Sequence, residues 1–386
     1  MSPIGNWNYP TPIKFGAGRI SELPEHCRAH GIERPLLVTD AGLASAPITS
    51  AALQSLQAAG LDVALFAQIK PNPVEANLID GLVAYRAGHH DGVIAFGGGS
   101  GLDMGKLIAF MSGQTRPVWD FEDIGDWWTR ADANGIAPII AVPTTAGTGS
   151  EVGRAGVLTD ERTHTKRIIF HPKMMPRVVI CDPELTIGMP ARITAGTGMD
   201  AFSHCLEAYC APGFHPMADG IAVEGMRLIA SALPLVMRDP TDIEARGQMM
   251  AAAAMGATAF QKGLGGMHAL AHPIGALHDS HHGMTNATLM PYVLAFNRNA
   301  IDERITRLAA YLGLPMPGFD SFLQFVLHLR REVGVPHTLP DLGVDDRHAA
   351  LIARMAVEDP SAGGNPLPLT EAGAAAIFAA ASNGIV

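Results

Sequence analysis

The first half of the 386-residue chain alternates short apolar runs with helix-like periods, and this order limits the folds that it can adopt. The runs that read as strands are PLLVTD (35–40), DVALFA (62–67), DGVIAF (91–96) and APIIAVP (137–143). Helices are expected between them, over residues 46–60 and 74–88 and from about Leu102. A repeated strand–helix–strand order makes the strands parallel and covers both sheet faces with helices. The pattern therefore predicts an α/β domain with a Rossmann-like, doubly wound parallel sheet.

The character of the chain changes after VVICDPELTIGMP (178–190). Helical periods and Ala- and Met-rich stretches such as MMAAAAMGATAF follow, and little in them reads as a strand. We therefore expect two domains, with residues 1–187 forming the α/β domain and residues 188–386 an all-helical one.

A glycine loop, AFGGGSGLDMGK (95–106), directly follows the third predicted strand. It fits neither common phosphate-binding fingerprint: a Walker loop would need Gly at Ser100 and Ser or Thr at Leu107, and the G-x-G-x-x-G pattern counted from Gly97 fails at Leu102. Successive glycines still let a backbone approach a ligand closely, and a helix beginning near Gly101 would favour an anion. The loop is compatible with a phosphate site or with a simple tight turn.

A second loop, PTTAGTGSE (143–151), follows the fourth predicted strand and precedes what reads as another helix start. Two such loops at neighbouring strand ends form the crevice where open α/β sheets bind nucleotides. Asp40, at the end of the first predicted strand, is placed to bond a ribose hydroxyl, which would favour NAD over NADP. A turn cap is the alternative role for Asp40.

One carboxylate and several imidazoles stand out in the second half. Asp200 and His204 are four residues apart, as are His268 and His272, so each pair would share one face of a helix. Further histidines follow at positions 278, 281 and 282. A ligand set of this kind suits Fe(II) or Zn(II). The residues alone leave open which of the five later histidines bind metal, and Ala269 after His268 disfavours a zinc-protease motif.

Composition excludes several other classes of protein. The net charge is −10 and no Lys/Arg block stands out, which argues against a nucleic-acid partner. The four cysteines form no metal pair or disulfide framework, the N-terminus lacks the pattern of a signal peptide, and no apolar run reaches the roughly 18 residues of a membrane span. We expect a cytoplasmic protein with no membrane partner.

Taken together and in this order, the glycine loop, PTTAGTGSE, GMDAFSHCLEAY and HALAHPIGALHDSHHG resemble the iron-containing (group III) alcohol dehydrogenase family along nearly the whole chain. The resemblance implies a dehydroquinate synthase-like fold, with a dinucleotide-binding domain and a helical metal-binding domain. It also implies an NAD- and metal-dependent oxidoreductase that interconverts a small alcohol and its aldehyde, and a homodimer or larger homo-oligomer.

The resemblance further implies roles for individual residues. The metal ligands would be Asp200, His204, His268 and His282, with Fe(II) or Zn(II) as the ion, and His272 would be a catalytic residue that relays a proton. The residues that would bind NAD are Asp40, Asn72, Gly97, Gly98, Gly99, Ser100, Asp103, Thr144, Thr145 and Lys166.

Within the family, the stretches RPLLVTD, FQKGLG and LHDSHHG look closest to 4-hydroxybutyrate dehydrogenases and related short-chain alcohol dehydrogenases. A carboxylate-bearing substrate would need a cation, for which Lys262 and Arg154 are candidates. The segment WDFEDIGDWW (119–128) is either a flap or a subunit contact. Three other functions compete: a metal-free reductase of the maleylacetate reductase type, an NAD- and metal-dependent lyase of the dehydroquinate synthase type, and a non-enzymatic metal- or nucleotide-binding protein.

Overall fold

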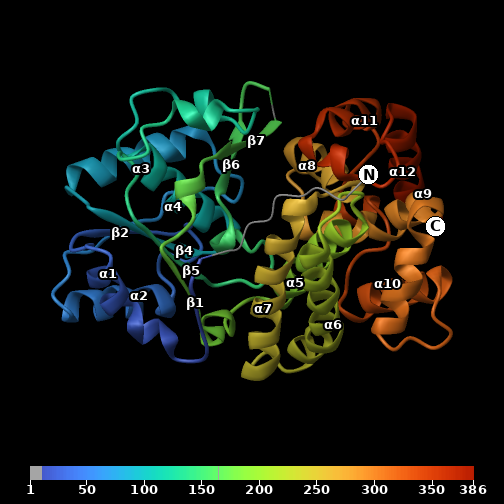
Figure 1. Cartoon of the computed structure of the whole chain (residues 1–386), viewed down its shortest axis with the longest axis horizontal. Coiled ribbons are helices and arrows are strands. Elements are labelled where there is room, and N and C mark those ends of the chain that lie inside the picture. The colour runs from blue at the N-terminus through green and yellow to red at the C-terminus, as the bar shows by residue number, and fades with distance from the viewer. Residues whose placement is uncertain (1–10, 164) are drawn as a thin grey trace. The chain divides into compact units, whose positions relative to one another are not determined.

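The computed structural model describes residues 11–163 and 165–386 (Figure 1). These residues fall into two compact units, one that ends at Gly188 and one formed by Met189–Val386. The division into domains at 1–187 and 188–386 stays a prediction. The expectation about a signal peptide concerns residues that lie mostly outside the described part of the chain.

The first unit is built on a six-stranded sheet in which every pair of neighbouring strands is parallel. Its strand order is β1-β8-β5-β4-β2-β3. The strands are β1 (Ile13–Phe15), β2 (Pro35–Val38), β3 (Ala64–Phe66), β4 (Gly92–Gly97), β5 (Ile139–Pro143) and β8 (Val178–Cys181). The four strands expected from the sequence are β2 to β5, and the predicted parallel sheet is confirmed.

Helices cover both faces of this sheet, with α1 and α2 on one side and α3 and α4 on the other (Figure 1). Their bounds are α1 (Leu23–Ala29), α2 (Pro47–Ala58), α3 (Glu75–Ala87) and α4 (Gly99–Met111). Leu37 and Ile94 point to the first face, where they pack against Leu56 of α2. On the other face, Ala95 lies so close to Gly105 of α4 that a Cβ at residue 105 would come within 2.6 Å of it. Successive residues of a strand therefore pack into two separate cores, one between each face of the sheet and the helices that cover it.

The helix expected after PTTAGTGSE is absent, so that prediction is wrong. A short 3-10 turn (Ser150–Val152) leads instead into an antiparallel hairpin of β6 (Ala155–Asp160) and β7 (Thr165–Phe170). The left-handed φ of 62° at Gly149 and the extended backbone at Gly153 interrupt any helix. Residues of β6 then alternate between half-buried and buried, which is the period of a strand.

The aromatic segment 119–128 packs against this hairpin. Glu122 forms a bridge with Ile169, and the Trp119 indole N–H donates to the Glu75 carboxylate at 2.8 Å. The segment includes the short turns η2 (Val118–Phe121) and η3 (Trp127–Arg130). Its aromatic side chains therefore belong to the packing of the first unit.

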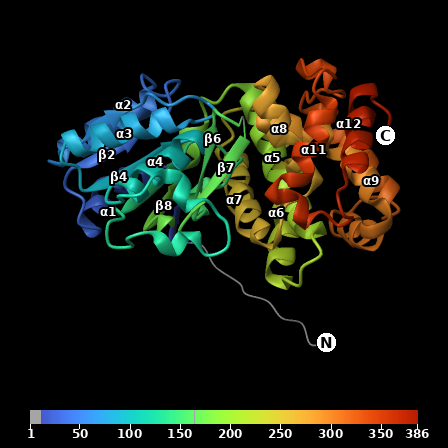
Figure 2. The same cartoon turned by 90° about the horizontal axis from the view of Figure 1, so that it is seen from above.

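The second unit contains no strand, and all of Met189–Val386 is described, so the predicted all-helical half is confirmed. Its α-helices are α5 (Ala191–Cys210), α6 (Pro216–Arg238), α7 (Ile243–Ala259), α8 (Gly266–His278), α9 (His282–Tyr311), α10 (Phe319–Glu332), α11 (Ala349–Glu358) and α12 (Glu371–Asn383). Figure 2 shows α5, α6 and α7 close together, with α8, α9, α11 and α12 grouped beside them.

Helix α6 has the length and hydropathy of a membrane span, with a mean hydropathy of 1.5 over its most apolar window. It packs against α5 and α7 along a stripe that includes Ala222, Ile229 and Leu233, all fully buried. Its opposite face carries the exposed Glu224–Arg227 ion pair. These contacts are those of a core helix.

Candidate metal centre and cofactor-binding loops

Helix α5 brings three ionisable side chains to one buried face. Asp200, His204 and Glu207 are spaced i, i+4 and i+7, so they follow one another along the same side of the helix. Their exposed fractions are 2%, 5% and 5%. A carboxylate so deeply buried needs compensating partners, and neighbouring helices supply them.

Those partners include His268 near the start of α8 and His282 at the start of α9. The Asp200 Oδ1 atom lies 4.0 Å from His268 Nε2 and 3.6 Å from His282 Nε2, and Asp200 Oδ2 lies 4.0 Å from His204 Nε2. The rings of His204 and His268 stack with their centroids 4.8 Å apart. The sequence-predicted ligands of both helical pairs thus meet around one carboxylate.

This donor set fits a metal ion. One donor atom each from Asp200, His204 and His268 lie within 4.8 Å of one another, and all three residues are buried. Two ligands about 2.1 Å from one ion are at most about 4.2 Å apart, so these donors need only small movements to share an ion. Carboxylate plus imidazole is a borderline donor set that suits Fe(II) or Zn(II). Asp200, His204 and His268 form a metal-binding site.

The remaining histidines differ in position. The His281 side chain caps α9 by accepting the Met284 N–H at 3.3 Å, and His278 ends α8 with its ring 5.8 Å from that of His348. The His272 ring lies parallel to the His282 ring, with centroids 5.4 Å apart and an interplanar angle of 11°. His272 therefore lies beside the cluster, whereas His278 serves neither the cluster nor its edge.

Asp359, which precedes the 3-10 turn η9 (Pro360–Gly364), orients His272. Its Oδ2 atom lies 2.8 Å from His272 Nδ1, and its Oδ1 atom accepts the Ser361 N–H at 2.8 Å. Burial by itself would raise the pKa of Asp359, but the neighbouring imidazole and the Ser361 N–H lower it below its usual value. An ionised Asp359 makes Nδ1 of His272 the protonated nitrogen and leaves Nε2 as the acceptor.

Sequence reasoning missed Asp359 and two further residues of the centre. Glu207 Oε2 lies 2.6 Å from His268 Nδ1, and Asn286 Nδ2 donates to Asp200 Oδ1 at 2.9 Å. The same amide nitrogen is 3.1 Å from His268 Nε2. Helical spacing was the available signal for two of them, because Glu207 lies three residues after His204 and Asn286 four after His282. No local pattern indicates Asp359.

In the first unit, the two predicted loops lie side by side. Strands β4 and β5 are neighbours, with Gly97 opposite Pro143. A Cβ on Gly98 would lie 3.1 Å from the Thr145 side chain, and one on Gly99 would lie 2.7 Å from that of Thr148. Helix α4 begins at Gly99, earlier than expected, and Gly98 caps it without a side-chain hydrogen bond. First-turn N–H groups of α4 are therefore available to an anion.

Other expected cofactor residues surround this helix start. The Asp40 Oδ1 atom accepts the N–H groups of Gly42 and Leu43, so Asp40 is a turn cap, and its second oxygen lies next to Gly97. The Ser100 hydroxyl donates to the Pro71 carbonyl, directly before Asn72. The loop of Asn72 also accepts the Thr159 N–H through Pro73, and Thr159 pairs across the hairpin with Lys166. Asn72, Ser100 and Lys166 thus belong to one connected edge of the first unit.

Asp103 and Lys106 connect α4 to the hairpin. Asp103 accepts the Ser150 hydroxyl at 2.5 Å and the Val157 N–H at 3.0 Å. The Lys106 ammonium, only 1% exposed, donates to the carbonyls of Ser150 and Ala155. Lys106 is therefore neither solvated nor free to bind a phosphate, because its ammonium bonds the buried backbone and pairs with Asp103.

The two candidate cations for a carboxylate-bearing substrate, Lys262 and Arg154, differ in whether their charge is already paired. The Lys262 ammonium is buried against Asp219 Oδ1 at 2.5 Å and the Tyr209 carbonyl at 3.2 Å, so it is already neutralised. The Arg154 guanidinium lies 5.4 Å from the Phe170 ring centroid. Lys262 is therefore unsuitable as a substrate-binding cation, and Arg154 stays a candidate.

A parallel α/β unit with paired glycine-rich loops and a helical unit with a buried Asp/His cluster place the chain among metal-binding proteins with a Rossmann-like sheet. Residues 10–183 match the model of the iron-containing alcohol dehydrogenase family, and residues 194–382 match its C-terminal model. The chain belongs to the iron-containing alcohol dehydrogenase family, which confirms the predicted resemblance.

Individual relatives agree over nearly full length. A 4-hydroxybutyrate dehydrogenase of Cupriavidus necator is 40% identical over 88% of this chain and 89% of its own. The crystal structure of a 1,3-propanediol oxidoreductase has a TM-score of 0.93 at 36% identity, covering 98% of this chain and all of the other. A sulfoacetaldehyde reductase from Bifidobacterium kashiwanohense, solved with NAD+, has a TM-score of 0.88 at 29% identity, covering 98% and 99%. The two solved relatives share the fold of this chain, and the names of the three relatives give different substrates.

Proposed function

We propose that this protein is an NAD-linked, metal-dependent dehydrogenase that interconverts a short-chain primary alcohol, diol or hydroxy acid and its aldehyde. The observation that carries the proposal is the buried cluster of Asp200, His204 and His268 in a member of the iron-containing alcohol dehydrogenase family. The same cluster weighs against a metal-free reductase of the maleylacetate reductase type.

His282 completes the proposed ligand set, supported by its Nε2 atom 3.6 Å from Asp200 Oδ1. A bound Fe(II) or Zn(II) would supply a Lewis acid that polarises the alcohol oxygen and lowers its pKa. The chain's own residues contact these ligands: Asn286 donates to Asp200, and Glu207 Oε2 lies 2.6 Å from His268 Nδ1.

His272 is the proposed proton relay. Its Nδ1–H is held by Asp359, which leaves Nε2 free to accept a proton released during oxidation and to return it during reduction. The stacking of the His272 ring against the His282 ring, with centroids 5.4 Å apart, supports this role.

The proposed NAD site is the start of α4 and its surroundings. NAD would supply the hydride acceptor at its nicotinamide ring. Gly97, Gly98, Gly99 and Ser100 would hold the pyrophosphate, and Thr144 and Thr145 of the adjoining loop would flank it. Asp40 would meet the ribose with the oxygen not used in its turn, and Asn72, Asp103 and Lys166 would complete the site. The NAD+ complex of the related sulfoacetaldehyde reductase supports the choice of cofactor.

Among substrates, 4-hydroxybutyrate is the first candidate, because the Cupriavidus relative is a 4-hydroxybutyrate dehydrogenase. Arg154 is then the proposed partner of the carboxylate. An Arg154→Ala variant should raise KM for 4-hydroxybutyrate and leave KM for 1-butanol unchanged. Equal changes for both substrates would remove Arg154 from this role.

The test is NADH formation, followed by absorbance at about 340 nm. Apo, Fe(II)-loaded and Zn(II)-loaded protein would be assayed with short alcohols, diols and 4-hydroxybutyrate, using NAD and NADP in parallel. Metal-dependent NADH formation is the expected result. Turnover without metal would point to the metal-free reductases, and bound NAD and metal with no net NADH would point to a lyase.

We also propose a homodimer or larger homo-oligomer in a reducing cytoplasm. The four cysteines support the compartment, since all are buried and free, and burial raises the pKa values of Cys27, Cys205 and Cys210 to about 12. Size-exclusion chromatography with light scattering would test the assembly.

A further inference from the structure

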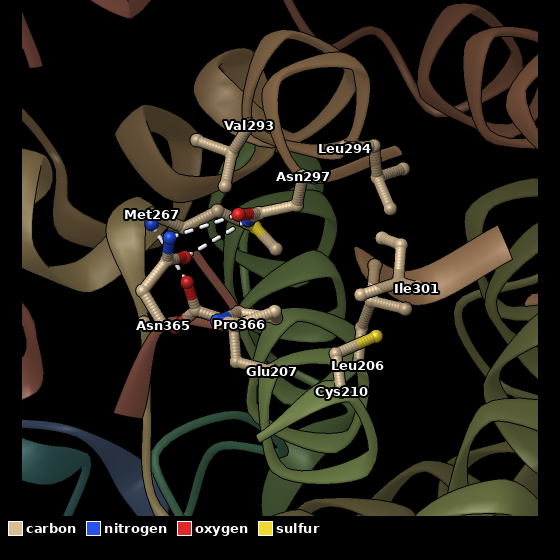
Figure 3. Close-up of a pocket in the computed structure, with 11 residues that line it drawn as sticks. Leu206, Glu207, Cys210, Met267, Val293, Leu294, Asn297, Ile301, Asn365 and Pro366 are labelled. Carbon is tan, nitrogen blue, oxygen red and sulfur yellow. Dashed lines mark hydrogen bonds between the residues drawn. The ribbon is translucent and has the colours of Figure 1, made fainter. Parts of the chain in front are cut away.

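The N-terminus of α8 takes its hydrogen-bond acceptors from distant parts of the chain. The cap residue Gly265 has no side chain to offer, yet the first N–H groups of a helix need partners. The Gly266 N–H donates to Asn365 Oδ1 at 3.0 Å, and the Met267 N–H donates to Glu207 Oε1 at 2.7 Å. Figure 3 shows Glu207, Asn365 and Met267 meeting at one small pocket.

Glu207 has a second contact that the cap does not require. Its other oxygen, Oε2, lies 2.6 Å from Nδ1 of His268, which follows Met267 in α8. The Glu207 side chain is only 4% exposed, so both oxygens are committed to α8. An ionised carboxylate only accepts, and His268 must then carry its proton on Nδ1. The Nε2 lone pair is left to face Asp200 and the metal site.

The backbone around this contact is shaped for it. A Cβ on Gly265 would come within 3.0 Å of Glu207 Oε1 and 3.1 Å of Asn365 Oδ1. A Cβ on Gly266 would come within 3.3 Å of the same Asn365 atom. Two successive glycines thus let the start of α8 approach the Glu207 and Asn365 side chains closely. The N–H groups of this helix start are therefore within reach of both acceptors.

We infer that Glu207 is a positioning residue of the metal centre: by bridging the Met267 N–H and His268 Nδ1, it fixes the tautomer and the direction of His268. The inference rests on the metal site of Asp200, His204 and His268 and does not depend on the substrate or the direction of the reaction. Carboxylates that hold a ligating histidine typically change metal affinity 10- to 100-fold when they are removed.

Glu207→Gln tests this with little change in shape. A Gln side chain has one acceptor oxygen, so it can serve the Met267 N–H or the His268 Nδ1–H but not both. Zn2+ affinity would be measured by competition with a chromophoric chelator, without substrate or NAD. The expected result is a 10- to 100-fold weaker Kd for E207Q, with Glu207→Asp between Gln and wild type.

Asn365→Ala is the matched control, because Asn365 caps the neighbouring N–H of the same helix without touching a histidine. It should lower the unfolding midpoint and leave the Zn2+ Kd within about threefold of wild type, well below the expected 10-fold effect. An E207Q affinity equal to wild type, or an equal loss in N365A, would overturn the inference.

Nitrogen-15 NMR of the imidazoles gives a second readout that needs no variant. In the zinc-loaded wild-type protein, His268 should carry hydrogen on Nδ1, with zinc at Nε2. Zinc at Nδ1, or hydrogen on Nε2, would overturn the inference even if E207Q failed to fold. Because neither measurement involves turnover, an unexpected substrate would leave both results interpretable.

Discussion

Glu151 is a carboxyl group buried in the first unit, at the end of the second glycine loop, and its replacement by Gln should stabilise the protein at alkaline pH. Its exposed fraction is 3%. Burial raises the pKa of Glu151 to about 7, and its own backbone N–H and the charge of Lys106 offset this only in part. The folded protein therefore holds a proton on Glu151 at pH values where the unfolded chain has lost it.

The magnitude follows from the two pKa values. The ordinary value is 4.5 and the folded value is about 7, and each pH unit of difference corresponds to roughly 1.4 kcal/mol. Ionised Glu151 therefore costs the folded protein about 3 kcal/mol above pH 7. Since the folded pKa is raised, this cost is absent below pH 4.5 and grows as pH rises from 4.5 to 7. Gln cannot ionise, so E151Q should exceed wild type by up to about 3 kcal/mol at pH 8 and match it near pH 4.

Urea unfolding followed by tryptophan fluorescence would measure this difference, because Trp119, Trp127 and Trp128 belong to the same unit as Glu151. Glu184→Gln, at an exposed carboxylate of that unit, is the control and should show no pH-dependent gain. A stability difference between E151Q and wild type that is flat from pH 4 to pH 8 would refute the reasoning. So would an E151Q variant that is less stable than wild type at pH 8.

Three further predictions concern the second unit. Gly283→Ala should destabilise this unit by about 3 kcal/mol and weaken Zn2+ binding, because the new Cβ would lie 2.2 Å from a backbone carbonyl of α5 beside the metal ligands. Urea unfolding would measure the loss of stability, and chelator competition the loss of Zn2+ affinity. Asp219→Asn should cost about 3 kcal/mol in urea unfolding followed by circular dichroism, because the Lys262 ammonium, whose side chain is 1% exposed, loses its anionic partner. Asp359→Asn should lower kcat about 10- to 100-fold with little change in KM, because one amide oxygen cannot accept both from His272 and from the backbone.

Each of these has a matched comparison. Gly220→Ala, on α6 with open space around the new Cβ, should not destabilise, and equal effects at both glycines would contradict the packing argument. Glu224→Gln, at the exposed ion pair of α6, should cost under about 1 kcal/mol. A D359N enzyme with wild-type kcat would show that His272 needs no orientation by Asp359.

Local sequence determined four strands of the first unit, the helical character of the second and the residue types of the proposed metal ligands. Apolar runs with strand and helix periods predicted β2 to β5 and the helical second half, since those periods depend only on local geometry. The i, i+4 spacing likewise put Asp200 and His204 on one face of α5. Local spacing failed at the hairpin of β6 and β7, where the alternation was present but the preceding glycines were read as a helix entry.

Tertiary packing decided which side chains from distant parts of the chain come into contact. Spacing along a helix fixes the direction in which a side chain points, but not which distant element lies opposite it. Glu207 reaches His268 across 61 residues, and His272 reaches Asp359 across 87, so no local pattern could pair them. Burial also determined the role of Lys262. Nothing in the sequence distinguishes it from a solvated lysine, but in the folded protein its charge is neutralised by Asp219. The chain's residue types determined that a metal site was possible, and helix packing determined which groups hold its ligands.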